Sequence, residues 1–514
     1  MKKFRFILAL VLVLTMVLST PLMALAKSWD VTDSAGVENA FATDTDDEVI
    51  INMQNDIVME NSVVANEGQN YTINGNGNTI ADVMIGGEGS VEINADVTSE
   101  VNSAAMEVYD AASVTVNGDV TGKSGNPDDV DYSDPMAYSD GDAGVYAYDQ
   151  AEITINGDVS GGNGYGTYGY AGDGVYAGDE AKVTVNGNVT GGSTNSDMGN
   201  GGYGVYADGD SYYDEYGEFV SVIPSVTVGG DVTGGNATNG TAGDGVIADD
   251  LAKVEVDGSV TGGDATSGLA GAGISTTNDS IITVGGDVTG GTATDDGESG
   301  NGIYADFNGY YWEGNEEGIE QGTVTVKGTV SGGEGAASIY FNAPESLAEL
   351  VKEMEALDLD AILDKAPAEL TDDDYVALEL ALMALISNGD LTEEELEAYG
   401  EEAGNINSIE EYMAFTQKVI NAEKTQEIDL MDAFGEIGLE YSLITVGSVS
   451  KENGPAYGSN AGEQFAQKMG EKNVVETNVE TPNTGDSFNP MLVLAVALVS
   501  LMGTAALVFK KKAA

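Results

Sequence analysis

A short pattern recurs seven times between residues 114 and 330, and this repetition restricts the folds open to the chain more than any other feature. Each copy has an apolar-polar-apolar triplet, two turn residues, a small polar or acidic residue and a valine, as in Val183–Val189. A second pattern, such as Gly174-Val175-Tyr176-Ala177, precedes most copies. The closing valines have a minimum spacing of 28 residues, and we interpret any excess as inserted loop; they are Val120, Val159, Val189, Val232, Val260, Val288 and Val330.

Each unit therefore supplies three short strands whose side chains alternate between inward and outward positions. A single unit cannot bury its apolar face, whereas stacked units bury a continuous core. We expect Val183, Val185 and Val189 to point inward and Thr184 outward. The pattern predicts a mainly β fold, a parallel β-helix, with a glycine column at a corner that needs a positive φ. The column is Gly118, Gly157, Gly187, Gly230, Gly258, Gly286 and Gly328.

Asn-Gly between apolar strands is also the strongest short-range hairpin signal, so a stack of β-hairpins is the competing interpretation. The strand after each turn has only two or three residues before a Gly-Gly or similar break, as at Val189-Thr190. This is too short for a good antiparallel partner. The recurrence of the same short strand favours the β-helix.

The N-terminal part of the repeat region fits the same fold. Val37–Ala42 is predicted as a short capping helix, and Glu48–Met53 and Tyr71–Ile80 as opening rungs. This segment resembles the start of pectate-lyase-like proteins, in which a cap helix precedes a rung of the form T-I-x-G-N-G-x-T-I. The resemblance extends over residues 30–341 and implies a right-handed parallel β-helix, which we assign to residues 27–343.

Residues 344–447 have a different pattern, because their apolar residues recur at helical spacing. Thr371, Thr392 and Ser408 each precede an acidic residue by three positions, which is typical of helix starts. The sequence predicts a C-terminal α-helical module that caps the open end of the solenoid. Residues 448–480 are polar and weakly patterned, and are predicted as a spacer.

The first residues of the chain predict export. Lys2, Lys3 and Arg5 form a charged start, an apolar run follows, and Ala24-Leu25-Ala26 places small residues where a signal peptidase cuts. Residues 1–26 are therefore predicted as a signal peptide. An uncleaved membrane anchor is the alternative.

The C-terminus has three parts in a fixed order. The motif Thr481-Pro482-Asn483-Thr484-Gly485 comes first, an uncharged span at 491–509 follows, and Lys510, Lys511 and Lys512 come next. Residues 481–514 resemble the LPxTG-like cell-wall sorting signal of sortase substrates, although Thr481 stands where the common form has Leu. The resemblance implies that a sortase cuts after Thr484 and joins the chain to peptidoglycan, so that the span crosses the membrane only before processing. A simple membrane tail anchor is the alternative.

Composition excludes several kinds of chemistry. The chain carries a formal net charge of −69, contains neither His nor Cys, and has Arg5 as its only arginine. Disulfides, thiol nucleophiles, Ser-His-Asp triads and His or Cys metal sites are therefore excluded. Nucleic acids and anionic polymers would be repelled. Lyases of the family that the chain resembles typically use an Arg or Lys base on an anionic sugar, so the charge argues against a lyase.

Two insertions rich in tyrosine interrupt the link between the first and second strands of a rung. Aromatic side chains on exposed loops often bind sugar rings or anchor a partner protein. Packing against rung edges is the alternative. The candidate ligand-binding residues are Tyr212, Tyr213, Tyr216, Tyr310, Tyr311 and Trp312.

Four acidic residues occupy the same turn position in different rungs: Asp119, Asp158, Asp231 and Asp287. Stacked rungs lie about 4.8 Å apart, so carboxylates in such a column repel one another unless they are solvated or bridged by cations. A solvated acidic edge is one interpretation. The other is a set of isolated Ca²⁺ sites, and calcium is the only cofactor that the sequence suggests.

These features indicate an extracellular, cell-wall-anchored protein that is processed by signal peptidase and sortase. We expect an adhesin or recognition platform that displays loops on a β-solenoid to a glycan or host-surface ligand. A surface carbohydrate-active hydrolase with paired carboxylates is the alternative, and a structural spacer is the third interpretation. We assign no catalytic residue and expect no nucleic-acid partner.

Overall fold

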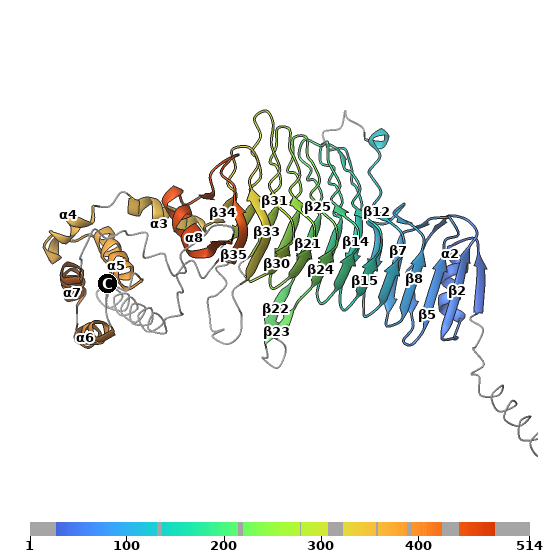
Figure 1. The fold of residues 1–514 in the computed structure, drawn as a ribbon, viewed down its shortest axis with the longest axis horizontal. Coiled ribbons are helices and arrows are strands. Elements are labelled where there is room, and N and C mark those ends of the chain that lie inside the picture. Colours follow the sequence, from blue (N-terminus) through green and yellow to red (C-terminus); the bar gives the residue numbers. More distant parts are fainter. Residues whose placement is uncertain are drawn as a thin grey trace, which may run out of the picture.

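The computed structural model describes residues 27–130, 136–213, 219–277, 279–306, 322–355, 358–387, 393–403, 406, 408–423 and 441–477. Within these residues the chain forms a long parallel β-helix, and a group of helices follows most of its rungs (Figure 1). Equivalent strands of successive rungs pair in parallel, as Val183 pairs with Val226 and Val175 with Val205. The mainly β fold and the parallel β-helix are thus confirmed.

Each rung contributes one strand to a first sheet, sheet B, and then a longer and a shorter strand to a second sheet, sheet A. The strands of sheet B are β4 (Val63–Ala65), β7 (Val83–Gly87), β10 (Ala104–Val108), β14 (Ala143–Ala147), β18 (Val175–Gly178), β21 (Val205–Asp208), β26 (Val246–Asp249), β29 (Ile274–Thr276), β32 (Ile303–Asp306), β34 (Ile339–Asn342) and β36 (Tyr457–Ser459).

The longer strands of sheet A are β1 (Lys27–Val31), β2 (Glu48–Met53), β5 (Asn70–Asn74), β8 (Ser90–Asn94), β11 (Ser113–Val116), β15 (Glu152–Ile155), β19 (Lys182–Val185), β24 (Ser225–Val228), β27 (Lys253–Val256), β30 (Ile281–Val284), β33 (Thr323–Ser331), β35 (Leu443–Val449) and β37 (Val474–Glu476). The shorter strands are β3 (Ile57–Val58), β6 (Ile80–Ala81), β9 (Val97–Thr98), β12 (Val120–Thr121), β16 (Val159–Ser160), β20 (Val189–Thr190), β25 (Val232–Thr233), β28 (Val260–Thr261) and β31 (Val288–Thr289).

The interior of the solenoid is filled by the valines, isoleucines and alanines of the repeat. Val183, Val185 and Val189 are buried, and Thr184 between them is partly exposed. The predicted inward and outward positions are therefore confirmed. In-register pairing places the same kind of side chain above and below each of these residues, so that every rung completes the core of its neighbours.

The glycine column has a different cause from the one that the sequence led us to expect. None of its seven glycines has a positive φ. A Cβ atom on Gly187 would instead lie 2.4 Å from the carbonyl oxygen of Gly157 in the preceding rung. Glycine is needed because two backbones meet closely at this corner, and the expectation of positive φ is wrong.

Positive φ occurs at another corner, where the chain passes from sheet B to the longer strand of sheet A. Asp110, Asp149, Asp179 and Asp250 have φ values of 59°, 54°, 53° and 42° there. Aspartate enters this region more readily than most residues. Its side chain also helps to stack the rungs, because Asp179 Oδ2 accepts a hydrogen bond from the Asp149 backbone N–H at 3.1 Å.

Between the shorter strand of sheet A and the next strand of sheet B, long loops stack into a ridge (Figure 1). At the base of the ridge, glycines of the outgoing and returning legs donate backbone hydrogen bonds to one another in an unbroken chain, with N–O distances of 2.8–2.9 Å. We call this segment the glycine neck. It comprises Gly162, Gly172, Gly192, Gly202, Gly235, Gly243, Gly263, Gly271, Gly291, Gly300 and Gly333.

The N-terminal end of the solenoid is closed by α2 (Ser34–Thr43), which confirms the predicted capping helix. Asp33 caps its first turn by accepting the Gly36 N–H at 3.0 Å. Val37 and Phe41 belong to the solenoid core, and the Phe41 ring stacks on Tyr71 with centroids 4.0 Å apart. The predicted opening rungs are β2 and β5, and β1 precedes them.

Among the described residues between β34 and β35, the chain forms five α-helices: α3 (Glu345–Glu355), α4 (Leu359–Leu363), α5 (Asp372–Ser387), α6 (Glu393–Ala403) and α7 (Ile409–Glu423). Helices α4, α5 and α7 share a core of their own, which includes Leu378, Leu385, Phe415 and Val419. The predicted capping box at Thr371 is present, because Thr371 Oγ1 accepts the Asp374 N–H and Asp374 accepts the Thr371 N–H.

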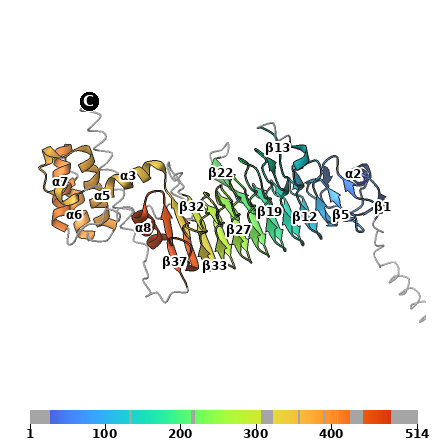
Figure 2. The ribbon, with the colours of Figure 1, turned by 90° about the horizontal axis from the view of Figure 1, so that it is seen from above.

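The solenoid continues after these helices, and this corrects two predicted boundaries. Residue 447, the predicted end of the helical module, lies inside β35, which pairs with β33. The predicted spacer 448–480 contains β36, β37 and α8 (Glu463–Asn473). Helix α8 lies beside the last strands (Figure 2), and its Phe465 and Met469 belong to the solenoid core. The solenoid core also includes Val351 of α3 and Ala384 of α5, so these helices and α8 together cover the end of the core.

The three terminal predictions concern residues outside the described part of the chain. The signal peptide 1–26 and the sorting signal 481–514 with its span 491–509 all lie there. Within the described ranges no helix is long and apolar enough to cross a lipid bilayer.

Candidate ligand-binding face

The outer surface of sheet B carries a row of tyrosines. In each Val-Tyr-Ala segment the flanking residues point into the core and the tyrosine points out, as Val175, Tyr176 and Ala177 show. Register pairing stacks these outward positions rung on rung. We call the set the tyrosine row, and it comprises Tyr146, Tyr176, Tyr206, Tyr304 and Tyr340, with Ile247 and Ser275 filling the two rungs in the middle.

The ring of Tyr176 contacts those of Tyr146 and Tyr206 edge to face, whereas the rings of Tyr304 and Tyr340 stack nearly parallel. The Tyr176 ring centroid lies 5.7 Å from that of Tyr146 and 5.2 Å from that of Tyr206, with interplanar angles of 89°. Such contacts fix ring orientation. Gly178 leaves room for the Tyr176 ring, since a Cβ there would lie 3.2 Å from it. All three rings remain partly exposed, so they offer an ordered aromatic surface to solvent.

Carboxylates flank the tyrosine row on both sides. Asp173 and Asp244 precede it in their rungs, and Asp208 and Asp249 follow it. The Tyr176 hydroxyl donates a hydrogen bond to Asp208 Oδ2 at 3.3 Å. The tyrosine row and these four aspartates together are the Tyr–Asp face.

The surroundings of these carboxylates favour their protonated form. Burial raises the pKa of Asp249 to about 7, and the nearby carboxylates of Asp208, Asp250 and Asp306 add to the effect. Burial raises the pKa of Asp173 to about 6, against the lowering effect of a hydrogen bond from the Tyr203 N–H. Both values lie above the ordinary range of aspartate because the charged form loses solvation.

The pKa values of the tyrosine hydroxyls in the row are raised as well. Burial, followed by the charge of Asp173, raises the pKa of Tyr146 to about 12, and burial with the charge of Asp208 does the same for Tyr206. The rings are therefore neutral at physiological pH. A surface of neutral phenols and hydrogen-bond-accepting carboxylates can stack on sugar rings, accept hydroxyl hydrogens and attract cations.

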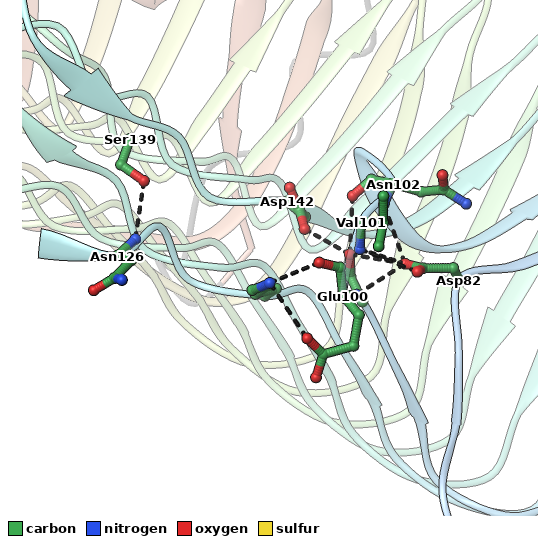
Figure 3. A network of polar contacts seen from close by, with 9 residues as sticks. Asp82, Glu100, Val101, Asn102, Asn126, Ser139 and Asp142 are labelled. Carbon is green, nitrogen blue, oxygen red and sulfur yellow. Dashed lines mark hydrogen bonds and ion pairs between the residues drawn. The ribbon is translucent and has the colours of Figure 1, made fainter. Parts of the chain in front are cut away.

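A second polar centre lies beside the loop after β9 (Figure 3). Asp82 is 0 % exposed and has a φ of 55°. Its carboxylate accepts backbone N–H groups from Glu100 at 2.8 Å, from Val101 at 3.0 Å and from Asn102 at 3.2 Å. These contacts compensate a buried carboxylate and shape the loop.

Ser99 joins this centre to Asp142, just before β14 (Figure 3). Its hydroxyl oxygen lies 2.5 Å from Asp142 Oδ2 and 3.3 Å from Asp82 Oδ1. Burial raises the pKa of Asp142. Because Asp82 has no exposed surface and both carboxylates already hold hydrogen-bond partners, we interpret the pair as a structural joint between two rungs rather than as a catalytic pair.

The four aspartates considered for calcium form a ladder of hydrogen bonds along sheet A. Asp119 Oδ1 accepts the Asp158 N–H at 2.9 Å, and Asp231 Oδ1 accepts the Ser259 N–H at 2.8 Å. Asp287 does the same for Thr329 at 2.7 Å. Asn and Ser can also accept such a bond, which explains why Asn188 and Ser259 share the column.

The ladder gives these aspartates a structural role that needs no cation. Across the described residues, no group of three or more acidic side chains is placed to hold a metal ion. Calcium binding elsewhere on this acidic chain stays a prediction.

The predicted aromatic loops are only partly described. Tyr212 and Tyr213 lie in β22 (Asp210–Tyr213), which forms an antiparallel hairpin with β23 (Phe219–Val222). The other candidates, Tyr216, Tyr310, Tyr311 and Trp312, lie outside the described residues. The hairpin borders an open groove of about 610 Å³ whose other lining residues include Asp110, Asp149 and Asp179.

The loop ridge holds a second open groove, of about 560 Å³, above the glycine neck. It is lined by small polar residues, among them Asn163, Thr194, Asn236 and Asp264. Much of their polarity is used within the ridge, since Asn163 Oδ1 accepts the Ser193 N–H at 2.8 Å and Asn236 Oδ1 accepts the Asp264 N–H at 2.8 Å.

The Tyr–Asp face was not among the sites predicted from the sequence, because the predicted aromatic candidates all lie in the insertions. The signal was in the repeat itself. Tyrosine recurs at the middle of the Gly-Val-Tyr-Ala pattern, and strand alternation alone places it on the outside once its neighbours are assigned to the core.

Comparison of the chain with protein-family models, curated proteins and solved structures finds no match. The case for function therefore rests on the sequence and on the geometry of the faces described above.

Proposed function

We propose that this chain is an extracellular, wall-anchored recognition protein whose β-helix presents the Tyr–Asp face to a glycan. The observation that carries the proposal is the tyrosine row, in which partly exposed rings of successive rungs lie in contact and carboxylates flank them. Aromatic surfaces with nearby hydrogen-bond acceptors are a common means of binding sugar rings.

The anchoring part of the proposal is supported by the terminal motifs alone. Replacing both Thr484 and Gly485 by Ala should move the protein from covalent wall material to the membrane fraction. Wall-linked protein that persists in this variant would show that sortase does not attach it. This experiment tests anchoring only, and either result leaves the glycan-binding proposal unchanged.

Binding is tested with the mature chain, residues 27–484, on a glycan array. The double variant Tyr176→Ala, Tyr206→Ala should lose at least tenfold in affinity, because each removes a ring from the centre of the face. The matched control is Tyr138→Ala, Tyr170→Ala, which removes two tyrosines that are 60 % and 49 % exposed and belong to no strand of sheet B. Equal losses in both variants, or in neither, would reject the face as the binding site.

A hydrolase with paired carboxylates is the second candidate. Asp208 and Asp249 occupy paired positions on adjacent strands. Burial raises the pKa of both carboxyl groups, and the charges of Asp210 and Asp179 add to the effect at Asp208, as the charge of Asp208 does at Asp249. One protonated and one ionised carboxylate is the requirement for glycoside hydrolysis. Release of reducing ends by the mature chain, abolished by Asp249→Asn, would support this candidate over simple binding.

A further inference from the structure

We propose that the Tyr–Asp face binds a polysaccharide whose sugars carry free ammonium groups, in preference to its neutral N-acylated counterpart. The inference rests on the proposed function, since it takes the face as a glycan-binding surface. It goes further by specifying the charge of the ligand.

The first argument is the uniform charge of the face. Its ionisable groups on either side of the tyrosine row are aspartates, and none of its positions holds a Lys or Arg. The lysines of the repeat region lie elsewhere, in strands of sheet A or in a loop: Lys123, Lys182, Lys253 and Lys327. Two of them are already paired with glutamates, Lys123 with Glu100 and Lys182 with Glu152. No internal cation therefore neutralises the face.

The second argument is the spacing of the carboxylates. In-register pairing places Asp208 directly beside Asp249, one rung away, which corresponds to about 4.8 Å. Two ionised carboxylates at this separation repel each other, and this repulsion helps to raise the pKa of Asp249. A ligand cation between them would favour the ionised pair and form two charge-assisted hydrogen bonds. A neutral hydroxyl could accept or donate there but would not remove the repulsion.

The tyrosine rings supply the third argument. A ring face attracts a cation within about 6 Å of its centroid, and it also stacks on the apolar face of a sugar. Tyr176 and Tyr206 lie in the rungs next to Asp208 and Asp249, so one amino sugar can place its ring on a phenol and its ammonium group on a carboxylate. An amino sugar thus uses both kinds of group on the face.

The topology favours a glycan over a cationic peptide. Strands β18, β21 and β26 are each paired on both sides, so their backbone N–H and C=O groups are engaged within sheet B. A peptide could not add to this sheet as a further strand at the face. It would have to bind through side chains alone, whereas a polysaccharide needs only rings and polar substituents.

The experiment compares two probes on the mature chain, a β-1,4-linked glucosamine hexamer and the N-acetylglucosamine hexamer of the same linkage, by calorimetry at a pH where the amino groups are charged. We expect the glucosamine hexamer to bind about tenfold tighter, and the difference to shrink as salt is raised. Asp208→Asn, Asp249→Asn should remove most of this preference. The matched control Asp158→Asn, Asp231→Asn removes the same charge from sheet A and keeps both ladder acceptors, so it should leave the preference intact.

Three results would overturn the inference. If the N-acetylated hexamer binds as tightly or tighter and still depends on Tyr176 and Tyr206, the charge preference is wrong while the glycan-binding proposal stands. If neither probe responds to the tyrosine double variant, the face is not a glycan site and both proposals fail. If a lysine hexapeptide binds as well as the glucosamine hexamer, with the same dependence on Asp208 and Asp249, the face selects ammonium groups without regard to sugars.

Discussion

In the interior of the β-helix, successive rungs are held together by side chains, whereas in the glycine neck they are held together by backbone alone. Val185 is fully buried between the rungs above and below it. Gly202 has no side chain, and its N–H donates to the Gly192 carbonyl at 2.8 Å while its own carbonyl accepts the Gly235 N–H at 2.8 Å. The interior draws its stability from apolar burial, and the neck from hydrogen bonds that require the closest approach of two chains.

The comparison teaches that one solenoid can use two packing rules side by side. The interior tolerates exchange between Val, Ile and Ala, because all of them fill space without polar atoms. The neck tolerates no side chain, since a Cβ atom on Gly202 would lie 1.9 Å from the Gly172 carbonyl oxygen. The loops above the neck can therefore vary in length while their bases remain glycine.

The largest effect is expected from a charge in the interior. Val185→Asp buries an unpaired carboxylate between rungs and should lower the free energy of unfolding by about 4 kcal/mol or more. Thr184→Asp places the same group on the outer surface and should cost about 0.5 kcal/mol or less. Denaturant unfolding of both variants measures the difference. Equal effects would mean that the interior is not dry and well packed at this rung.

Adding a single methyl group in the glycine neck should already lower the free energy of unfolding. Gly202→Ala introduces one methyl group against a carbonyl oxygen and should cost about 2–3 kcal/mol. The matched control is Gly335→Ala, where nothing lies within 4 Å of the new Cβ but φ is 83°, so only backbone strain of about 1 kcal/mol is expected. Unfolding free energies, with amide exchange at Gly192 and Gly243, test the pair. Equal costs would show that the neck can open to admit a side chain.

The interior was predictable from the sequence, and so was the outward position of the tyrosines in the Gly-Val-Tyr-Ala pattern, whereas the glycine neck was not. Alternating apolar residues identify buried positions such as Val185 directly. A position such as Gly187 can require glycine for several physical reasons. The sequence alone does not distinguish a positive φ from a close approach of two backbones. The late rung at Ile444–Val446 repeats the apolar-Thr-apolar pattern and pairs with β33. Its pairing could not be predicted from the repeat spacing, because the helices lie between the two strands in the sequence.

The aspartate ladder beside the interior should give a smaller effect than either region. Asp231→Ala removes the acceptor of the Ser259 N–H and should cost about 1 kcal/mol. Asp231→Asn keeps an acceptor oxygen and removes a negative charge, so it should be close to neutral. Thermal unfolding compares the two variants. If the Ala and Asn variants have the same melting temperature, the hydrogen bond from the Ser259 N–H contributes nothing measurable to stability, and only the charge of Asp231 matters.

The smallest effect should come from the Tyr–Asp face, where Asp173 and Asp249 are more buried than the exposed aspartates of the ladder. The folded-state pKa values of Asp173 and Asp249 are about 6 and about 7, above the unfolded value of 3.8. A raised folded pKa means that the folded state binds the proton more tightly, so the stabilisation is fully present below about pH 3.8 and is lost as pH rises through about 6 and 7. These two groups should therefore make the melting temperature fall between about pH 4 and pH 7, by an amount that solvent screening limits. Asp249→Asn should flatten this part of the profile relative to Asp231→Asn, a control that removes an equal charge from the ladder. An unchanged slope of melting temperature against pH in Asp249→Asn would show that the Asp249 carboxylate is solvated in both the folded and the unfolded state. Stacking aspartates on the outer surface of sheet B would then destabilise the fold no more than it does along sheet A.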